Sequence, residues 1–301
     1  MRCAACKQHA GLAGPWHHRD TMTDTRTDAR ETPFDFGAYR RRIQFDGPAT
    51  PTLDTLTRLI ERHAATLPFE NIDVLGGRVP SLELASLQAK LVQGRRGGYC
   101  FEQNGLFLAA LKEVGFVVAG LEARVRAGVP ADVVTARTHM ALRVTLQGED
   151  YLADVGFGGF APTAPLKLSE RGDQHDPIGT YRFVDVKSDL LLQCQTHDGW
   201  TDCYQIGPGE PQQIDYEMGN WFVATHHKAM LRHNLLVARS TPAGRLTLFN
   251  GKLSLRNGAA APPEESSLAA RAEFADVLRD AFGLQIDDAD LDAVMAVLER
   301  Q

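Results

Sequence analysis

The sequence predicts an α+β protein with a helical first third, a central antiparallel sheet or small barrel, and a tail that mixes strands with helices. Three observations support this class. Apolar residues recur at helical spacing as far as Val114. From Val117 to Gln205, short β-rich runs alternate with turns that contain Gly, Asp or Pro. After Leu235 the chain shows a strand pair and then two helical patterns.

The helical part begins near Phe34, after a polar leader over residues 1–32 that we expect to be disordered. The first clear helix ends before Pro68, because proline cannot continue a helix. Its apolar residues recur at helical spacing: Leu53, Leu56, Leu59 and Ile60. Two more helices are expected, over 84–91 and over 99–114.

The central and C-terminal elements follow from turn residues and β-rich runs. Six central strands are expected, over 117–125, 140–146, 151–155, 180–186, 190–196 and 200–205. In the tail we expect a hairpin of 235–239 with 245–249, which turns at 241–244. Two helices should follow over 266–282 and 288–300, with Asp287 or Asp288 as the N-cap of the second.

Composition limits the function classes. The chain has 301 residues, 44% of them hydrophobic and 23% charged, which is ordinary for a globular protein. Its net charge is −6 with both signs spread along the chain, so no basic block indicates nucleic acid. No apolar run approaches the roughly 20 residues of a membrane span. Residues 1–20 lack the apolar core of a signal peptide, and we expect a cytoplasmic protein without membrane or nucleic-acid partners.

Metal and disulfide sites are not indicated. Five cysteines in so long a chain do not suggest a disulfide framework. Cys3 and Cys6 form a CxxC pair, but no second ligand pair accompanies it. The chain also has a loose histidine cluster without a nearby carboxylate or cysteine, formed by His226, His227 and His233. We therefore expect no metal.

Cys100 is the first candidate for chemistry. Gly97 and Gly98 precede it, so the backbone there can turn tightly and approach a ligand closely. The cysteine then falls in the first turn of the expected helix, where free N–H groups and the helix dipole favour a thiolate. A core cysteine on an amphipathic helix is the alternative, and position alone leaves both open.

His139 is the histidine best placed to serve a thiolate nucleophile, which usually needs such a partner. It opens the strand over 140–146 and faces the side opposite to Met140 and Leu142. A hydrogen-bonded strand histidine without a catalytic role remains the alternative here.

Asp154 stands in an apolar strand, where an aspartate is rare unless it is paired. If residues 147–150 form the turn, parity places His139 and Asp154 on one face of a hairpin. That register leaves them four residues apart, about 13 Å along the strand. A bulge, a bend or another register would be required, and Arg143 is a rival partner for Asp154.

Four segments together resemble the motifs of arylamine N-acetyltransferases, in the order and with the spacings that suit that family. They are residues 67–73 (Leu-Pro-Phe-Glu-Asn-Ile-Asp), 96–104 (Arg-Gly-Gly-Tyr-Cys-Phe-Glu-Gln-Asn), 139–144 (His-Met-Ala-Leu-Arg-Val) and 154–159 (Asp-Val-Gly-Phe-Gly-Gly). The resemblance runs from about Phe34 to the C-terminus. It favours the pair His139–Asp154 over Arg143–Asp154.

The resemblance implies a cysteine-protease-like Cys-His-Asp core in three parts. These are a helical bundle over 33–115 that carries the nucleophile, a β-barrel over 116–224 that carries His139 and Asp154, and an α/β lid over 225–301. It implies that acetyl-CoA donates an acetyl group to Cys100 and that an arylamine, arylhydrazine or arylhydroxylamine then accepts it, in a ping-pong reaction. A homo-oligomer is left open.

The resemblance also implies binding residues. Phe69, Phe157 and Leu231 should line the acceptor pocket, and the residues near CoA should be Thr135, Ala136, Gly158 and Gly159. Further residues should fix the Cys100 loop by hydrogen bonds: Arg96, Glu102 and Asn104. Core packing is the alternative for the two phenylalanines. His227 and Leu231 depart from the family, which often has proline and phenylalanine there, so acceptor preference and CoA affinity are open.

Three other functions compete with this hypothesis. A CoA-independent thiol hydrolase or transglutaminase-like enzyme would use the same Cys-His-Asp set. An amide synthase of secondary metabolism would use the same scaffold with another acyl donor. A non-catalytic binding protein is disfavoured, because it gains nothing from an activated thiolate.

Overall fold

The computed structural model describes residues 33–258 and 262–300, so the leader expected over 1–32 lies outside it, as does the Cys3–Cys6 pair. The predicted α+β class is confirmed, and the elements of the first part are helical. They are α1 (Phe36–Arg42), α2 (Leu53–Thr66), α3 (Ile72–Leu75), α4 (Leu84–Leu87), which continues in the π-helical turn η1 (Gln88–Gln93), and α5 (Cys100–Val114). Helix α2 is capped by the Thr52 side chain, which accepts the Thr55 N–H.

A large antiparallel sheet curls into an almost closed barrel in the middle of the chain. Its strands are β2 (Val117–Val125), β3 (Arg137–Leu146), β4 (Glu149–Ala153), β5 (Leu166–Lys167), β6 (Gln174–Asp176), β7 (Gly179–Val186), β8 (Asp189–Thr196) and β9 (Gly199–Ile206). They pair in the order β5-β4-β3-β2-β9-β8-β7-β6. The six predicted strands are confirmed, each with ends within a few residues of the expected ones.

A second antiparallel sheet combines one early strand with four late ones, in the order β1-β10-β11-β12-β13. Its members are β1 (Phe69–Glu70), β10 (Leu236–Thr241), β11 (Gly244–Phe249), β12 (Lys252–Arg256) and β13 (Glu264–Ser267). The predicted hairpin in the tail is β10–β11. Because β1 pairs with β10, the segment just before Cys100 lies close to the C-terminal part of the chain.

The first C-terminal helix begins later than predicted, whereas the second begins at Asp288 as expected. The helix expected over 266–282 was wrong at its start, because Ser266 and Ser267 pair with β12 as part of β13. Helix α7 (Arg271–Asp276) follows and continues in the π-helical turn η4 (Val277–Ala281). Helix α8 (Asp288–Leu298) has Asp287 as its N-cap, one of the two predicted residues.

Helix α6 (Gln213–Thr225) was not predicted. Ile214, Met218 and Trp221 lie on it with 59%, 66% and 61% of their surface exposed, so the helix lacks a clean division into apolar and polar faces. Two 3₁₀ turns, η2 (Gly158–Phe160) and η3 (Met230–Arg232), complete the irregular connections around the site.

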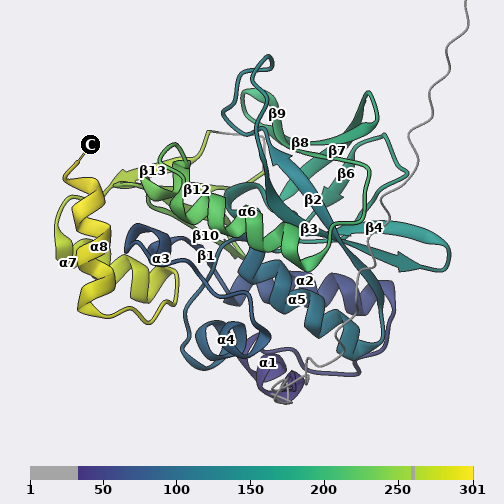
Figure 1. Ribbon diagram of the computed structural model, residues 1–301, viewed down its shortest axis with the longest axis horizontal. Helices are drawn as coiled ribbons and strands as arrows, with labels where there is room; N and C mark the ends of the chain where they lie inside the picture. Colours follow the sequence, from purple (N-terminus) through teal and green to yellow (C-terminus); the bar gives the residue numbers. More distant parts are fainter. Residues whose placement is uncertain (1–32, 259–261, 301) are drawn as a thin grey trace, which may run out of the picture. The chain divides into compact units, whose positions relative to one another are not determined.

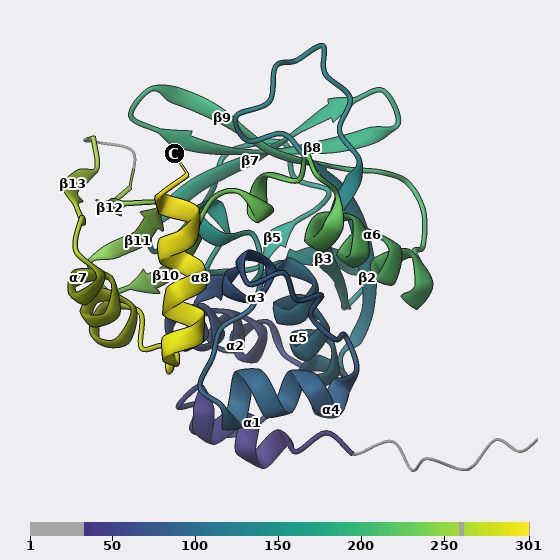
Figure 2. The ribbon, with the colours of Figure 1, turned by 60° about the vertical axis from the view of Figure 1, so that its left-hand side comes forward.

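Three apolar cores hold these elements. The first joins the early helices to β3 and β4 and includes Cys100 and Phe69. The second fills the barrel, and the third lies between the second sheet and helices α7 and α8. Figures 1 and 2 show α1, α2, α4 and α5 gathered on one side of the barrel sheet, with α7 and α8 beside the second sheet and α3 next to α8. In the described ranges, no helix is long and apolar enough to cross a membrane.

Candidate active site

The register of the β3–β4 hairpin decides where His139 and Asp154 meet. Leu146 pairs with Glu149, so the turn contains only Gln147 and Gly148, not the four residues that the sequence suggested. Both turn residues have positive φ, at 52° and 82°, as in the type I′ turns that match strand twist. Glu149 and Asp150, expected in the turn, are strand residues.

This register removes the 13 Å gap that the expected pairing left. Leu142 pairs with Ala153, so continuing the ladder places Asp154 beside Ala141, two residues from His139 rather than four. Side chains on such diagonal positions lie within reach of each other. His139 Nε2 and Asp154 Oδ2 are 2.8 Å apart. The rival Arg143 instead lies 3.4 Å from a Glu210 oxygen.

The His139 ring is buried and holds a proton readily. Burial by itself lowers the pKa of an imidazole, but the charge and hydrogen bond of Asp154 outweigh it, and a hydrogen bond with the Cys100 thiol adds to this effect. Together they raise the pKa of His139 to about 9. At neutral pH the ring is therefore an imidazolium whose Nε2–H donates to Asp154, and Nδ1 is the ring nitrogen left to serve the thiol.

Asp154 is held as a carboxylate by several donors. Burial would raise its pKa, but His139 lowers it, and so do the Asn104 side chain and the Gly156 N–H. Asn104 Nδ2 donates to Asp154 Oδ1 at 2.9 Å, and the Gly156 N–H donates to the same oxygen at 2.8 Å. The net pKa of Asp154 lies below its usual value, so the buried aspartate stays charged.

Cys100 is the first residue of α5, with 6% of its surface exposed. As a thiol it donates to the Thr138 carbonyl, with sulfur and oxygen 3.6 Å apart. Gly156 lies against it, since a Cβ built there would stand 2.8 Å from Cys100 Cα. The absence of a side chain at Gly156 therefore lets the chain after Asp154 reach the start of α5.

The glycines before Cys100 make close contacts within the protein. A Cβ on Gly97 would stand 2.1 Å from the Pro68 carbonyl oxygen, and one on Gly98 would stand 2.9 Å from the Glu102 side chain. The Glu70 N–H also donates to the Gly98 carbonyl at 3.1 Å. The two glycines therefore let this loop approach β1 and α5 closely.

The residues predicted for the acceptor pocket lie around this group. The Phe157 ring stands edge-on to His139, with centroids 4.9 Å apart. The Phe69 ring packs on Gly158, whose Cβ position would be 3.4 Å from it. Leu231, in η3, is half-buried and packs on the core that contains Cys100 and Phe69.

The residues predicted near CoA fall in two places. Thr135 and Ala136 lead into β3; the Arg124 side chain donates to the Thr135 carbonyl, and Ala136 lines a cavity of about 490 Å³ beside α6. Gly158 and Gly159 form η2 after Asp154. Arg256 donates to the Gly159 carbonyl at 2.7 Å, which links η2 to β12.

Sequence reasoning missed two neighbours of the buried pair. Asn104 was expected to fix the Cys100 loop, but it joins Asp154 to the Met140 carbonyl, at 2.9 Å and 2.7 Å. Tyr204 was not considered, and its ring lies 4.5 Å from that of His139. An amide four residues after the cysteine, inside an apolar helix, was the available signal for Asn104.

In the part of the chain that the structure describes, no metal site is indicated. Within residues 33–258 and 262–300, no group of three or more His, Cys, Asp or Glu side chains could hold a metal ion. His226, one of the clustered histidines, instead stacks on Phe222, with ring centroids 4.3 Å apart.

Known proteins share both the sequence and the fold. Residues 52–291 match a family model described as N-acetyltransferase. The chain is 42% identical over 253 residues to the arylamine N-acetyltransferase of Escherichia coli (strain K12), covering 83% of this chain and 89% of the relative. It is 38% identical over 270 residues to the Salmonella typhimurium arylamine N-acetyltransferase / N-hydroxyarylamine O-acetyltransferase, covering 87% and 95%.

Solved structures agree with these relatives. The arylamine N-acetyltransferase of Mycobacterium marinum, in complex with CoA, superimposes with a TM-score of 0.83 at 36% identity. That match covers 88% of this chain and 99% of the other. The Salmonella typhimurium enzyme superimposes with a TM-score of 0.82, also at 36% identity, over 90% of this chain and all of the other.

Proposed function

Since the chain belongs to the arylamine N-acetyltransferase family, we propose that it moves an acetyl group from acetyl-CoA to the nitrogen of an aromatic amine or hydrazine, through an acetyl-cysteine. The contact that carries this proposal is the 2.8 Å pair of His139 and Asp154, whose imidazole is hydrogen-bonded to the Cys100 thiol. The relatives named above are called arylamine N-acetyltransferases, and the Mycobacterium marinum enzyme is solved in complex with CoA.

In the first half-reaction, the proton of Cys100 is held on His139, so the Cys100 thiolate attacks the thioester carbonyl and the carbonyl oxygen becomes an oxyanion. The Cys100 N–H lies in the first turn of α5, where it has no partner within the helix, and it is our candidate donor to that oxyanion. When the intermediate collapses, the carbon–sulfur bond to CoA breaks and His139 protonates the departing thiolate. Cys100 then carries the acetyl group as a new thioester.

In the second half-reaction, His139 is neutral and acts as a base. The amine or hydrazine nitrogen attacks the acetyl carbonyl of Cys100, and its proton passes to His139. The bond to the Cys100 sulfur then breaks, which releases the amide and restores the thiolate–imidazolium pair. Asp154 keeps the imidazole in one orientation throughout, and it stabilises the charged form of the ring.

The same geometry supports the proposed binding residues. Phe69 and Phe157 bring aromatic faces close to Gly158 and His139, which suits an aromatic acceptor. We retain Leu231 as the third lining residue. For CoA, the proposed contacts remain Thr135, Ala136, Gly158 and Gly159, of which the two glycines present backbone without side chains.

The test is to mix the protein with acetyl-CoA alone and to measure its mass. We expect one added acetyl group, on the tryptic peptide 97–112 that contains Cys100, and its loss on addition of an arylamine with formation of one equivalent of amide. Cys100→Ala should stay unmodified, whereas Cys3→Ala and Cys6→Ala should be acetylated normally. An unmodified wild-type protein that still turns over both substrates would contradict the acetyl-cysteine, and amide cleavage without CoA would favour a hydrolase.

A further inference from the structure

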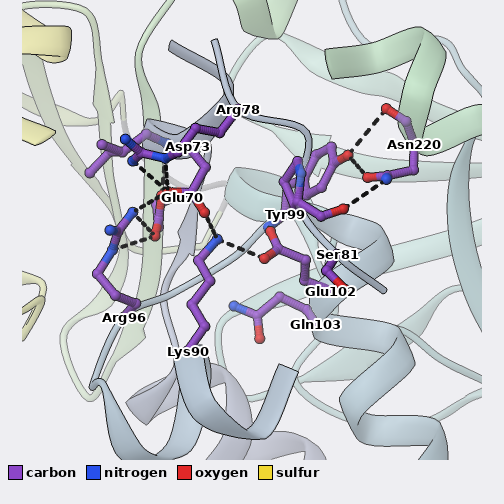
Figure 3. A network of polar contacts seen from close by, with 12 residues as sticks. Glu70, Asp73, Arg78, Ser81, Lys90, Arg96, Tyr99, Glu102, Gln103 and Asn220 are labelled. Carbon is purple, nitrogen blue, oxygen red and sulfur yellow. Dashed lines mark hydrogen bonds and ion pairs between the residues drawn. The ribbon is translucent and has the colours of Figure 1, made fainter. Parts of the chain in front are cut away.

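Seven charged side chains surround the start of α5 without touching the pair His139–Asp154. The carboxylates belong to Glu70, Asp73, Glu102 and Asp290, and the cations to Arg78, Lys90 and Arg96. Figure 3 shows Lys90 between Asp73 and Glu102. The chemistry proposed above uses none of these groups, although one of them lies two residues from Cys100.

Glu102 contacts the main chain next to the nucleophile. It is 1% exposed, and its Oε2 accepts the N–H of Tyr99 at 3.1 Å. Its other oxygen, Oε1, lies 2.6 Å from Lys90 Nζ. The carboxylate therefore ties the residue before Cys100 to a fixed cation in η1, and it caps α5 at its first turn.

Tyr99 is held from a second side. Its ring is fully buried, and its hydroxyl donates to the Asn220 side chain of α6. Asn220 in turn donates to the Pro80 carbonyl at 2.9 Å. The residue before Cys100 is thus fixed through its backbone by Glu102 and through its hydroxyl by α6 (Figure 3).

We propose that Glu102, held by Lys90, is a positioning residue that keeps the main chain of Cys100 in the orientation needed for attack. This role rests on the proposed function, because Cys100 must be the nucleophile for its orientation to matter. Both Glu102 oxygens accept hydrogen bonds, one from nitrogen of the main chain and one from an ammonium. A glutamine has only one acceptor, so at one of the two contacts a donor would face a donor.

The charges that face Glu102 make this device depend on pH. Burial raises the pKa of Glu102, Lys90 lowers it, and the carboxylates of Glu70 and Asp73 raise it, with a net value of about 7. Protonation near neutral pH would remove the charge from the contacts to Lys90 and Tyr99. The start of α5 should then loosen, and the reactivity of Cys100 should fall.

The experiment measures alkylation of Cys100 by iodoacetamide against pH, followed by mass spectrometry of the tryptic peptide 97–112. This readout needs neither acetyl-CoA nor an acceptor, so it separates the positioning role from the proposed reaction. In the wild-type protein we expect the rate to step down as pH falls through about 7. In Glu102→Gln the alkylation rate should show no such step. At a pH above the wild-type step, Cys100 of this variant should react about tenfold to a hundredfold more slowly than in wild type.

Acetyl transfer supplies a second measurement on the same variant. Glu102→Gln should lower kcat/KM for acetyl-CoA, because this ratio reports the half-reaction in which Cys100 is the attacking group. The matched control is Glu113→Gln, which changes an exposed carboxylate near the other end of α5 and should behave like wild type in both assays.

Lys90→Met keeps the idea testable if Glu102→Gln does not fold. Removing the cation takes away a charge that lowers the pKa of Glu102, so the alkylation step should move to higher pH. Two results would overturn the proposal: a Glu102→Gln profile that superimposes on wild type, or a Lys90→Met step at an unchanged pH. If the alkylation rates change with pH as predicted but acetyl-CoA never acetylates Cys100, the proposed function is refuted. The positioning role of Glu102 would still stand.

Discussion

His139 has different neighbours at its two ring nitrogens, and this difference controls its charge. Nε2 faces the Asp154 carboxylate, which raises the pKa of the ring above the usual 6.5 in spite of burial. A histidine alone in the same strand would instead lose its proton on burial. The pairing therefore explains how a buried imidazole can hold a proton at neutral pH, which the proposed acetyl transfer requires of it.

The raised pKa of His139 predicts a loss of stability with rising pH. Below pH 6.5 the ring is protonated in both the folded and the unfolded chain, so the stabilisation by Asp154 is fully present. It is lost as pH rises through about 9, and it amounts to about 3 kcal/mol. Urea unfolding of wild type and His139→Gln between pH 6 and 10 checks this, because only wild type should show the decline. Parallel curves would contradict it.

The contacts of Asn104 lead to a second prediction about a single residue. Asn104→Ala removes the donor to Asp154 and the acceptor for the Val155 N–H, both buried. We expect the free energy of unfolding to fall by about 2–3 kcal/mol, and kcat to fall because the pKa of Asp154 rises and the imidazole loses its fixed partner. Denaturation and acetyl transfer measure the two effects. The exposed Asn257→Ala should be neutral in both, and a normal kcat in Asn104→Ala would refute the link.

Among the elements, the β3–β4 hairpin shows where local signals were sufficient and where they were not. The strands were predictable from alternation, but the turn was placed over four residues because Glu149 and Asp150 look like turn residues. In the folded chain these two polar side chains belong to the half-exposed end of the strand, and Asp150 accepts from Thr145. Register depends on the turn type, and Gln147–Gly148 is not one of the strong type I′ signals.

Gly97 lies in the loop between η1 and α5, where its lack of a side chain leads to a testable prediction. In Gly97→Ala the new methyl group would meet the Pro68 carbonyl and the Glu70 side chain, which cannot both move away. The loop should shift from β1, at a cost of about 2–3 kcal/mol in unfolding free energy. Urea unfolding measures this. Gly207→Ala, whose nearest neighbour would be the flexible Arg137 side chain, is the control and should change little.

At the scale of the whole molecule, Asp290 connects the last helix to the loop before Cys100. Its carboxylate lies 2.6 Å from Arg96 and also pairs with Arg78. Arg96 continues to Glu70, at 2.8 Å, so a chain of charges joins α8 to β1. The members are spread from residue 70 to residue 290, and no spacing in the sequence connects them, which is why the network was not predicted.

Removing this link should weaken the whole fold. In Asp290→Asn, Arg78 and Arg96 lose a charged partner in a mostly buried place, and we expect about 2 kcal/mol lower unfolding free energy. Asp292→Asn changes an exposed ion pair on the same helix and should cost about 0.5 kcal/mol or less. Equal effects of the two substitutions in urea unfolding would show that the buried link does not matter.

The sequence therefore predicted the parts of the molecule that depend on neighbours along the chain. Cys100, His139 and Asp154 were singled out because their motifs are local, and the hairpin register brings His139 to Asp154. The approach of Cys100 depends in addition on Gly156, which lies against the start of α5. What was missed depends on contacts between distant segments. Helix α6 holds Tyr99 through Asn220, and Tyr204 of β9 packs on His139, and neither contact has a trace in local spacing.

The two-residue turn at Gln147 and Gly148 divides the site between two lengths of chain. Both turn residues are exposed, and the turn lies at the end of the hairpin away from His139. A polypeptide opened there would carry Cys100 and His139 on one fragment and Asp154 on the other. Acetyl transfer by such a pair would then appear only when the fragments reassemble, which makes this turn the natural place for a split-enzyme reporter.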